Sequence, residues 1–185
     1  MKRRSFLPIP FVASLAGVSL ASLALGKAKQ SPRKSALVRA GKDRSDKPFR
    51  FLDADFTVKV SEQDTEGRCV VFDTLRHANV GPQLHIHTNC DEWFWVMSGE
   101  FKFQSGDDIM RLKAGDSLLV PQGVQHAFVK VSEGDARLVI MHQPAVGMET
   151  YFREALLLPD QTPEGRRSLA EKHGMRFVGP SLTPD

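Results

Sequence analysis

GPQLHIHTNCDEWFWVMSG, residues 81–99, carries two histidines and a glutamate between two glycines. His85 and His87 stand two residues apart in a run that reads as a β-strand, and such side chains point to the same face of a sheet. Glu92 follows a short polar break and opens a second apolar run. Two imidazoles and one carboxylate can therefore converge on one point, which indicates a metal site within β-structure.

The sequence from residue 49 onward has the pattern of an all-β domain. Short runs rich in β-branched and aromatic residues alternate with turn signals, and this pattern predicts roughly ten strands. We expect them near residues 51, 57–60, 68–75, 83–87, 92–97, 100–104, 109–112, 117–120, 126–131 and 136–142. Such short, closely spaced strands favour an antiparallel barrel or sandwich over alternating strand–helix units.

A second motif supplies a fourth candidate ligand. It comprises Gly115, Pro121, Gly123 and His126 in the spacing G-x5-P-x-G-x2-H. Because proline fixes φ and glycine adopts conformations that other residues resist, we expect a turn that returns His126 to a strand facing the first three ligands. Neutral imidazoles and a carboxylate suit a divalent transition metal ion. Three histidines and one glutamate leave about two positions open on a six-coordinate ion, as in catalytic sites.

Together the two motifs resemble those of single-domain cupins. The first matches as His85-x-His87-x4-Glu92-x6-Gly99, and the second ends at Lys130, where asparagine is usual but no ligand is expected. The resemblance covers about residues 50–145 and implies a cupin antiparallel β-barrel of the double-stranded β-helix or jelly-roll type. It also implies one bound divalent metal ion, namely Fe or Mn, or alternatively Ni, Co or Zn. The implied ligands are His85, His87, Glu92 and His126.

Strand parity predicts the lining of this barrel. If Glu92 points inward, Phe94 and Val96 do the same, whereas Trp93, Trp95 and Met97 point outward. An apolar interior around one polar ion suits a planar or aromatic ligand. The outward tryptophans need cover, either from the partner in a homodimer, which we expect, or from C-terminal helices. The predicted substrate-binding residues are Gln83, Phe94, Val96, Phe103, Phe128 and Met141.

The remaining histidines and the cysteines are interpreted as ordinary groups. His77, His142 and His173 are expected to be satisfied core residues without a ligand role. Cys69 and Cys90 are the only cysteines and lack zinc-finger spacing. A disulfide is conceivable in an exported protein, and Cys90 lies close to the ligands, but two free thiols are the preferred interpretation.

The N-terminus has the features of an export signal. Residues 2–7, KRRSFL, are followed by an uncharged apolar run and then by small residues, as in a cleaved secretory signal peptide over residues 1–28. Arg3-Arg4 before Ser-Phe-Leu resembles the twin-arginine consensus, so we expect transport by the twin-arginine translocase to the periplasm or another exported location. An ordinary secretory signal and a single-pass anchor are the alternatives. As the resemblance implies, the twin-arginine route carries folded proteins, so the metal could be acquired before export.

The regions on either side of the barrel complete the expected organisation. Residues 29–48 are polar, basic and aperiodic, which predicts a disordered linker, and the barrel then occupies residues 49–145. Residues 146–185 predict a helical extension, with one helix over 148–157 and another that follows Thr162 and ends near Gly174. These helices are expected to pack outside the barrel or to reach a second subunit.

The overall charge does not indicate a nucleic-acid partner. The sequence has a formal net charge of +3 and a pI near 9.0. Without the four basic residues of the signal peptide, the charge falls from +3 to −1. A basic face for nucleic acid or an acidic membrane is therefore not expected on the remaining chain. The four residues are Lys2, Arg3, Arg4 and Lys27.

The resemblance implies a dioxygenase-type oxidoreductase, similar to quercetin dioxygenases, that acts on a small phenolic, enolic or diketone substrate. Glu92 would serve as a ligand and as the base for a substrate hydroxyl. Two other classes stay open, because a fold and a metal do not fix a reaction. One is a non-redox isomerase, lyase or decarboxylase of a hydroxy- or keto-acid, in which the ion acts as a Lewis acid. The other is a non-catalytic periplasmic ligand-binding protein.

Overall fold

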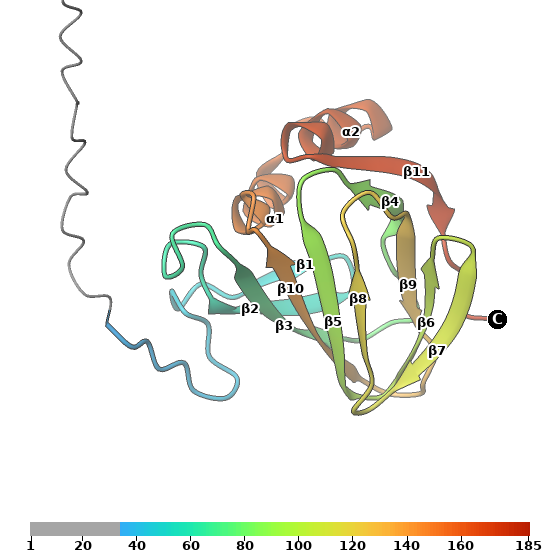
Figure 1. Cartoon of the computed structure of the whole chain (residues 1–185), viewed down its shortest axis with the longest axis horizontal. Helices are drawn as coiled ribbons and strands as arrows, with labels where there is room; N and C mark the ends of the chain where they lie inside the picture. Colours follow the sequence, from blue (N-terminus) through green and yellow to red (C-terminus); the bar gives the residue numbers. More distant parts are fainter. Residues whose placement is uncertain (1–33) are drawn as a thin grey trace, which may run out of the picture. The chain divides into compact units, whose positions relative to one another are not determined.

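The computed structural model describes residues 34–185, which form eleven strands and two helices (Figure 1). The predicted signal peptide at 1–28 and residues 29–33 of the predicted linker lie outside this range. No helix of the described range is long and apolar enough to span a membrane. The strands are β1 (Phe49–Phe51), β2 (Ala54–Val60), β3 (Val70–Arg76), β4 (Gln83–His87), β5 (Asp91–Ser98), β6 (Glu100–Ser105), β7 (Asp108–Lys113), β8 (Ser117–Val120), β9 (His126–Lys130), β10 (Ala136–Gln143) and β11 (Met175–Ser181). The helices are α1 (Met148–Leu157) and α2 (Pro163–Lys172).

The strands form two antiparallel sheets that enclose the core (Figure 1). The six-stranded sheet has the order β1-β2-β3-β10-β5-β8, and the five-stranded sheet has the order β11-β4-β9-β6-β7. Non-consecutive neighbours such as β3 and β10 bring distant segments of the sequence together. The predicted all-β barrel with a small C-terminal helical part is confirmed.

Period-two alternation decides which side chains fill the barrel. In β5, Phe94 and Val96 are fully buried, whereas Trp95 and Met97 are exposed, so the predicted parity of this strand is confirmed. Phenylalanines from both sheets then meet in the core, where the rings of Phe94 and Phe103 lie 5.0 Å apart. Their burial removes apolar surface from water and is the main contribution to the stability of the barrel.

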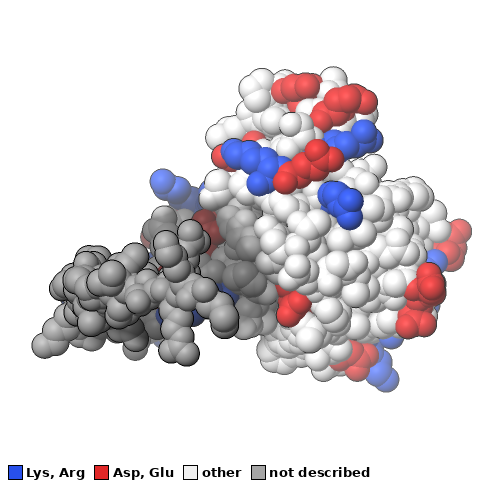
Figure 2. All heavy atoms as spheres, turned by 45° about the horizontal axis from the view of Figure 1, so that its top comes forward, with Lys and Arg blue, Asp and Glu red and all other residues white. Residues whose placement is uncertain are grey.

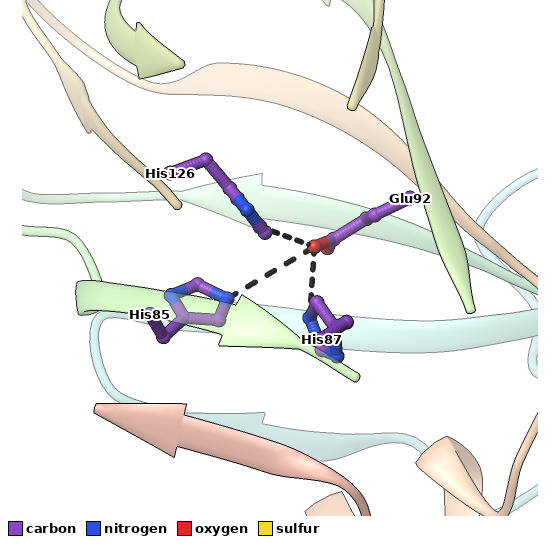
Figure 3. A group of neighbouring side chains, drawn as sticks. All are labelled: His85, His87, Glu92 and His126. Atoms are coloured by element: carbon purple, nitrogen blue, oxygen red, sulfur yellow. Dashed lines mark hydrogen bonds and ion pairs between the residues drawn. The ribbon is translucent and has the colours of Figure 1, made fainter. Parts of the chain in front are cut away.

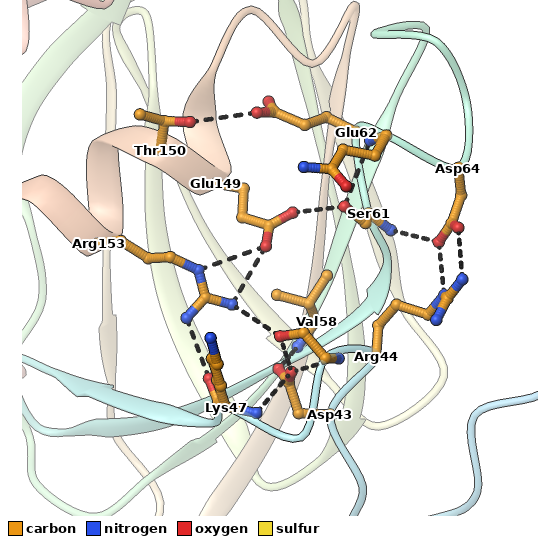
Figure 4. A network of polar contacts seen from close by, with 12 residues as sticks. Asp43, Arg44, Lys47, Val58, Ser61, Glu62, Asp64, Glu149, Thr150 and Arg153 are labelled. Carbon is orange, nitrogen blue, oxygen red and sulfur yellow. Dashed lines mark hydrogen bonds and ion pairs between the residues drawn. The ribbon is translucent and has the colours of Figure 1, made fainter.

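Polar contacts fix part of the predicted linker to the barrel (Figure 4). The buried carboxylate of Asp43 accepts a hydrogen bond of 2.7 Å from the backbone N–H of Val58 in β2. Arg44 forms two hydrogen bonds of 2.8 Å to the carboxylate of Asp64. Arg153 of α1 donates to the carbonyl of Lys47 at 3.0 Å. These contacts do not fit the disorder predicted for this part of residues 29–48, because each places a polar group of the segment against a fixed partner.

The C-terminal extension contains both expected helices and also a strand that joins the barrel. The side chain of Thr162 caps α2 by accepting from the N–H of Gly165 at 3.1 Å. The segment after α2 forms β11, which pairs with β4 in the register Met175–His87 and Phe177–His85. Many of the charged side chains on the face shown in Figure 2 lie on the helical part, above a broad uncharged surface. The extension therefore does more than cover the barrel, because β11 adds an edge strand to the sheet that carries three of the four candidate ligands.

Candidate metal centre

Four candidate ligands meet between the two sheets (Figure 3). His85 and His87 come from β4, and His126 from the neighbouring strand β9, where it stands opposite His85. Glu92 comes from β5 in the other sheet. The four side chains are buried, and their ligand atoms lie within 4.8 Å of one another. The structure thus brings together the set predicted from the two motifs.

The three imidazoles converge on one oxygen of Glu92. Oε2 lies 2.7 Å from Nε2 of His126, 3.0 Å from Nε2 of His87 and 4.0 Å from Nε2 of His85. All three rings therefore present the same nitrogen to a single point, which is the arrangement that a metal ion requires of its ligands.

Backbone carbonyls orient two of these rings. Nδ1 of His85 lies 2.7 Å from the carbonyl oxygen of Gln83, and Nδ1 of His126 lies 3.1 Å from that of Val124. A carbonyl only accepts, so each Nδ1 carries the proton, and a neutral ring then directs the lone pair of Nε2 into the cluster. The fold itself thus selects the tautomer that can bind a metal.

The turn of the second motif is attached to the end of the first. The N–H of Gly123 donates to the carbonyl of His87 at 2.8 Å, and the N–H of Gln122 donates to the carboxylate of Asp91 at 2.8 Å. Gly123 has φ +84°, a left-handed value that glycine adopts without strain. These bonds set the position of His126 relative to the first three ligands.

Burial and the charges within the cluster lower the pKa values of three of the four candidate ligands, which favours the protonation states that bind a cation. Burial alone would raise the pKa of Glu92, but the charges of His142 and His87 and the hydrogen bonds from His126 and His142 hold it well below its usual range. Burial, followed by the charges of His126 and His87, holds the pKa of His85 well below 6.5. Burial also lowers the pKa of His87, against the opposing charge of Glu92. The carboxylate is therefore ionised, while these two imidazoles are neutral.

His126 behaves differently, because it makes the shortest contact with the carboxylate. Burial lowers the pKa of His126, but the hydrogen bond and the charge of Glu92 outweigh it, and the pKa is raised. Nε2 of His126 therefore binds a proton more readily than that of an ordinary imidazole. One anionic oxygen and three imidazole nitrogens in a buried site fit a divalent transition metal ion by donor type and number.

The cluster adjoins a cavity of about 860 Å³ that extends from the barrel interior towards α1, α2 and β11. His85, His87 and Glu92 contribute to its wall, and much of the remaining wall is apolar or aromatic. A small organic molecule held there would contact the cluster directly. Further lining residues include Phe128, Ile140, Tyr151 and Phe152.

The predicted substrate-binding residues divide into three groups. Gln83 and Phe128 line the cavity. Phe94, Val96 and Phe103 are fully buried and do not line it, so they pack in the core beneath the site. Met141 was expected to point inward, but the alternation of β10 places it on the opposite face. Its neighbours Ile140 and His142 face the cavity instead.

His142 is a site residue that the sequence interpretation missed. Its side chain is 1% exposed, and its Nε2 lies 3.2 Å from Oε1 of Glu92. The register of β10 and β5 places His142 directly opposite Glu92. The interpretation of His142 as an ordinary core residue is therefore wrong, because its ring contacts the second oxygen of the central carboxylate.

The other two histidines lie outside the cluster. His77 bridges Asp55 and Asp135 at 3.0 Å each, and it is half-buried, not a core residue. His173 follows α2, is buried, and contacts Glu154 at 2.9 Å. Both rings are satisfied by carboxylates, so neither is needed to explain the site.

Both cysteines are free, as preferred from the sequence. Cys90 is buried, and burial, followed by the charges of Glu92 and Asp91, raises its pKa to about 12. A thiol that keeps its proton is a poor metal ligand, because thiolate is the binding form. Cys90 is also not among the four residues of the cluster.

Comparison with known proteins agrees with this fold. Residues 72–142 match the family model described as Cupin domain, and no curated protein matches the sequence. A predicted oxalate decarboxylase from Thermotoga maritima is 16% identical with a TM-score of 0.50, covering 52% of this chain and 91% of that chain. KdgF from Halomonas sp. is 16% identical with a TM-score of 0.48, covering 53% and 86%. Pac13 from Streptomyces, a nucleoside dehydratase, is 16% identical with a TM-score of 0.47, covering 74% and 87%.

At these identities the comparisons bear on the fold and leave the reaction open. The family match spans β3 to β10 and therefore includes all four residues of the cluster and His142. Residues 72–142 are thus similar to the cupin domain, and the barrel holds a His-His-Glu-His cluster that could bind a metal ion.

Proposed function

We propose that this protein is a metal-dependent enzyme that uses one divalent transition metal ion, Fe or Mn or alternatively Ni, Co or Zn. The ion is held by His85, His87, Glu92 and His126. One observation carries the proposal: the four buried ligand atoms lie within 4.8 Å of one another, and three of the four residues, His85, His87 and Glu92, line a cavity large enough for a small organic substrate. A ligand cluster that faces a cavity has a side available for substrate, whereas a structural metal site is closed by protein.

The leading reaction is a dioxygenase-type oxidation of a small phenolic, enolic or diketone substrate. The aromatic wall formed by Phe128, Tyr151 and Phe152 supports a planar substrate. When bound, the metal supplies Lewis acidity and, as Fe or Mn, access to dioxygen chemistry. Glu92 is better suited to the role of ligand than to that of general base, because a carboxylate whose pKa lies well below its usual range binds a proton weakly.

A non-redox reaction on a hydroxy- or keto-acid is the second candidate, and the charge of the cavity favours it. The wall includes the side chains of Arg76, Arg166 and Arg167. Cationic groups of this kind attract an acidic substrate. An isomerase, lyase or decarboxylase would use the same four ligands without consuming dioxygen.

Metal analysis and an oxygen-uptake screen test the proposal. Purified protein should contain close to one equivalent of a transition metal, and a His85→Ala/His126→Ala variant should lose it. Retention of the metal by that variant would disprove the ligand assignment. A variant with His77→Ala, which alters a histidine outside the cluster, is the control and should keep the metal.

Oxygen dependence separates the candidate reactions. Oxygen consumption with flavonols, catechols or diketones supports the dioxygenase. Turnover of a hydroxy- or keto-acid under nitrogen with Zn or Ni supports the non-redox enzyme. Binding of a phenolic ligand without any product at full metal occupancy would instead indicate a non-catalytic ligand-binding protein.

We also propose that the protein is exported to the periplasm by the twin-arginine translocase and acts as a homodimer. The export proposal rests on the sequence of residues 1–28, and an Arg3→Lys/Arg4→Lys variant should remain unexported while a reporter with the native sequence is exported. The dimer proposal rests on the outward apolar side chains of β5, such as Trp95.

A further inference from the structure

Arg76 places a positive charge in the wall of the cavity. It ends β3 with only 3% of its surface exposed, and it lines the same cavity as His85 and Glu92. Its guanidinium carbon lies 4.9 Å from the ring centre of Phe128 and 5.6 Å from that of Phe56. Removing a guanidinium from water is costly, so a cation retained at this position needs compensation from its surroundings.

Asp53 provides only part of that compensation. One of its oxygens accepts from Nη1 of Arg76 at 2.9 Å, and the other accepts from the N–H of Ala78 at 3.3 Å. Nε of Arg76 is buried and has no hydrogen-bond partner within residues 34–185. A guanidinium can form two parallel hydrogen bonds to one carboxylate, whereas Arg76 forms a single hydrogen bond to Asp53. Further N–H groups of Arg76 are therefore available to a second acceptor.

The rest of the cavity wall has an excess of positive charge. Arg166 and Arg167 of α2 line its outer part, and Glu92 is the only acid among the described lining residues. The charge of Glu92 is directed at the histidine cluster, where it would be matched by a metal ion. A ligand that is electrostatically complementary to this cavity therefore carries a negative charge.

The wall between these charges is mainly apolar. Phe51, Phe128, Ile140 and Phe152 contribute to it. Tyr151 adds a buried hydroxyl whose pKa is raised to about 12 by burial, against the charge of Arg166, so the hydroxyl keeps its proton and can donate. A ligand that matches this wall has an apolar body and an acidic group at one end.

We propose that Arg76 forms an anion subsite and that the substrate is a carboxylic acid with an apolar or aromatic body. Its carboxylate binds the guanidinium of Arg76, and its other end faces the histidine cluster. The identification of this ligand as the substrate rests on the proposed enzymatic function, whereas the anion subsite rests on Arg76 and the cavity alone. A purely structural Arg76–Asp53 pair is the competing explanation, and it predicts no preference for acids.

Calorimetric binding of three acids and their methyl esters tests the subsite. The probes are phenylacetate, phenylpyruvate and cinnamate, because each ester keeps the body of the acid and removes its charge. At least one acid should bind about tenfold or more tightly than its ester, the range expected when hydrogen bonds to a charged group are lost. Equal binding of acids and esters, or no binding of any acid, would overturn the proposal.

A paired substitution removes the subsite without leaving a buried charge alone. In an Asp53→Asn/Arg76→Gln variant, the preference for the acid should disappear while circular dichroism remains unchanged. Arg137→Gln is the matched control, because Arg137 forms two bonds of 2.7 and 2.6 Å to Asp73 and lies outside this cavity. If the paired variant does not fold, Arg76→Lys is used instead, because lysine keeps the positive charge but lacks the planar guanidinium. The preference for the acid over its methyl ester should then fall severalfold. An unchanged preference in either folded variant contradicts the proposal.

Metal-free and metal-loaded protein separate this inference from the proposed function. The preference that depends on Arg76 should appear in both forms, because the subsite does not include the metal. If the preference for the acid over its ester required metal and persisted in the paired variant, the carboxylate would bind the metal. That result would disprove the assignment of Arg76 as the anion subsite. Metal content of the His85→Ala/His126→Ala variant decides the proposed function independently.

Discussion

The imidazole of His142 lies beside the carboxylate of Glu92 on the neighbouring strand, with Nε2 3.2 Å from Oε1. The other oxygen of Glu92 is turned towards His87 and His126. The register of β10 and β5 fixes this pairing, because His142 and Glu92 are direct partners in the sheet. We infer that His142 holds one carboxylate oxygen so that the other remains directed at the metal position.

Replacing His142 should weaken metal binding without abolishing it. His142→Leu removes the hydrogen bond to Glu92, and loss of such a supporting contact costs about 10- to 100-fold in metal affinity. Competition with a chelating dye measures the affinity. His173→Gln is the control, because this histidine contacts Glu154 away from the cluster.

Two results would contradict the role inferred for His142. Unchanged affinity in His142→Leu would show that the contact with Glu92 has no influence on the metal. Complete loss of binding, equal to that of His126→Ala, would instead identify His142 as a ligand.

The two motifs predict the ligand set well because each encodes its geometry locally. The H-x-H spacing places His85 and His87 on one face of β4, and the Pro121–Gly123 turn returns the chain to His126. The position of His142 is not encoded locally, because β10 has apolar residues on both faces and either parity fits the sequence. Only its long-range register with β5 decides the inward face.

The C-terminal strand and the Arg76 subsite were missed for a similar reason. The strand predicted at 68–75 ends one residue before Arg76, and nothing in the neighbouring sequence connects Arg76 with Asp53. The turn between β1 and β2 brings that carboxylate to it. Likewise, the sequence predicts only a short extended piece at residues 176–179 and does not show that this segment pairs with β4. Both features depend on contacts between segments that are far apart in sequence.

The stabilising effect of His77 should depend on pH in a defined direction. Hydrogen bonds to Asp135 and Asp55 raise the pKa of His77 above 6.5 in the folded protein. A raised pKa means that the stabilisation is complete below pH 6.5 and is lost as the pH rises through the folded value. The free energy of unfolding lost in His77→Gln should therefore be larger at about pH 6 than at about pH 9.

Urea unfolding of the metal-free protein measures this difference. The effect should be small, because the two carboxylates are about half exposed and solvent screens them. In a protein that already carries Asp55→Asn and Asp135→Asn, the loss of unfolding free energy caused by His77→Gln should no longer depend on pH. If the loss of unfolding free energy in His77→Gln instead increased with pH, the two carboxylates would not stabilise the protonated form of His77.

Gly81 is needed for a close approach between segments. A Cβ at this position would collide with the carbonyl oxygen of Phe128, a backbone atom of β9 that cannot move without disturbing the strand. Gly81→Ala should destabilise the protein by about 1–3 kcal/mol, as overpacking does, and thermal or urea unfolding measures the loss. Gly106→Asn is the control, because the site has open space and φ +59°, which asparagine tolerates. Equal stability of Gly81→Ala and the native protein would contradict the steric argument.

The outer face of β5 and β8 should form the proposed dimer interface. Trp95 and Met97 are 41% and 38% exposed, and Leu119 on β8 is 56% exposed. The C-terminal helices therefore do not cover this face, which removes one of the two expected sources of cover. Large apolar side chains that gather on one surface are typical of a protein interface.

Light scattering of a Trp95→Ser/Leu119→Ser variant tests this interface. The native protein should have the mass of a dimer, and the variant should have half that mass, because it loses apolar area at the centre of the contact. Ile109→Ser is the matched control: Ile109 is also 56% exposed but lies on β7 of the other sheet. A monomeric native protein would refute the dimer, and a variant that remains dimeric would place the interface on another face.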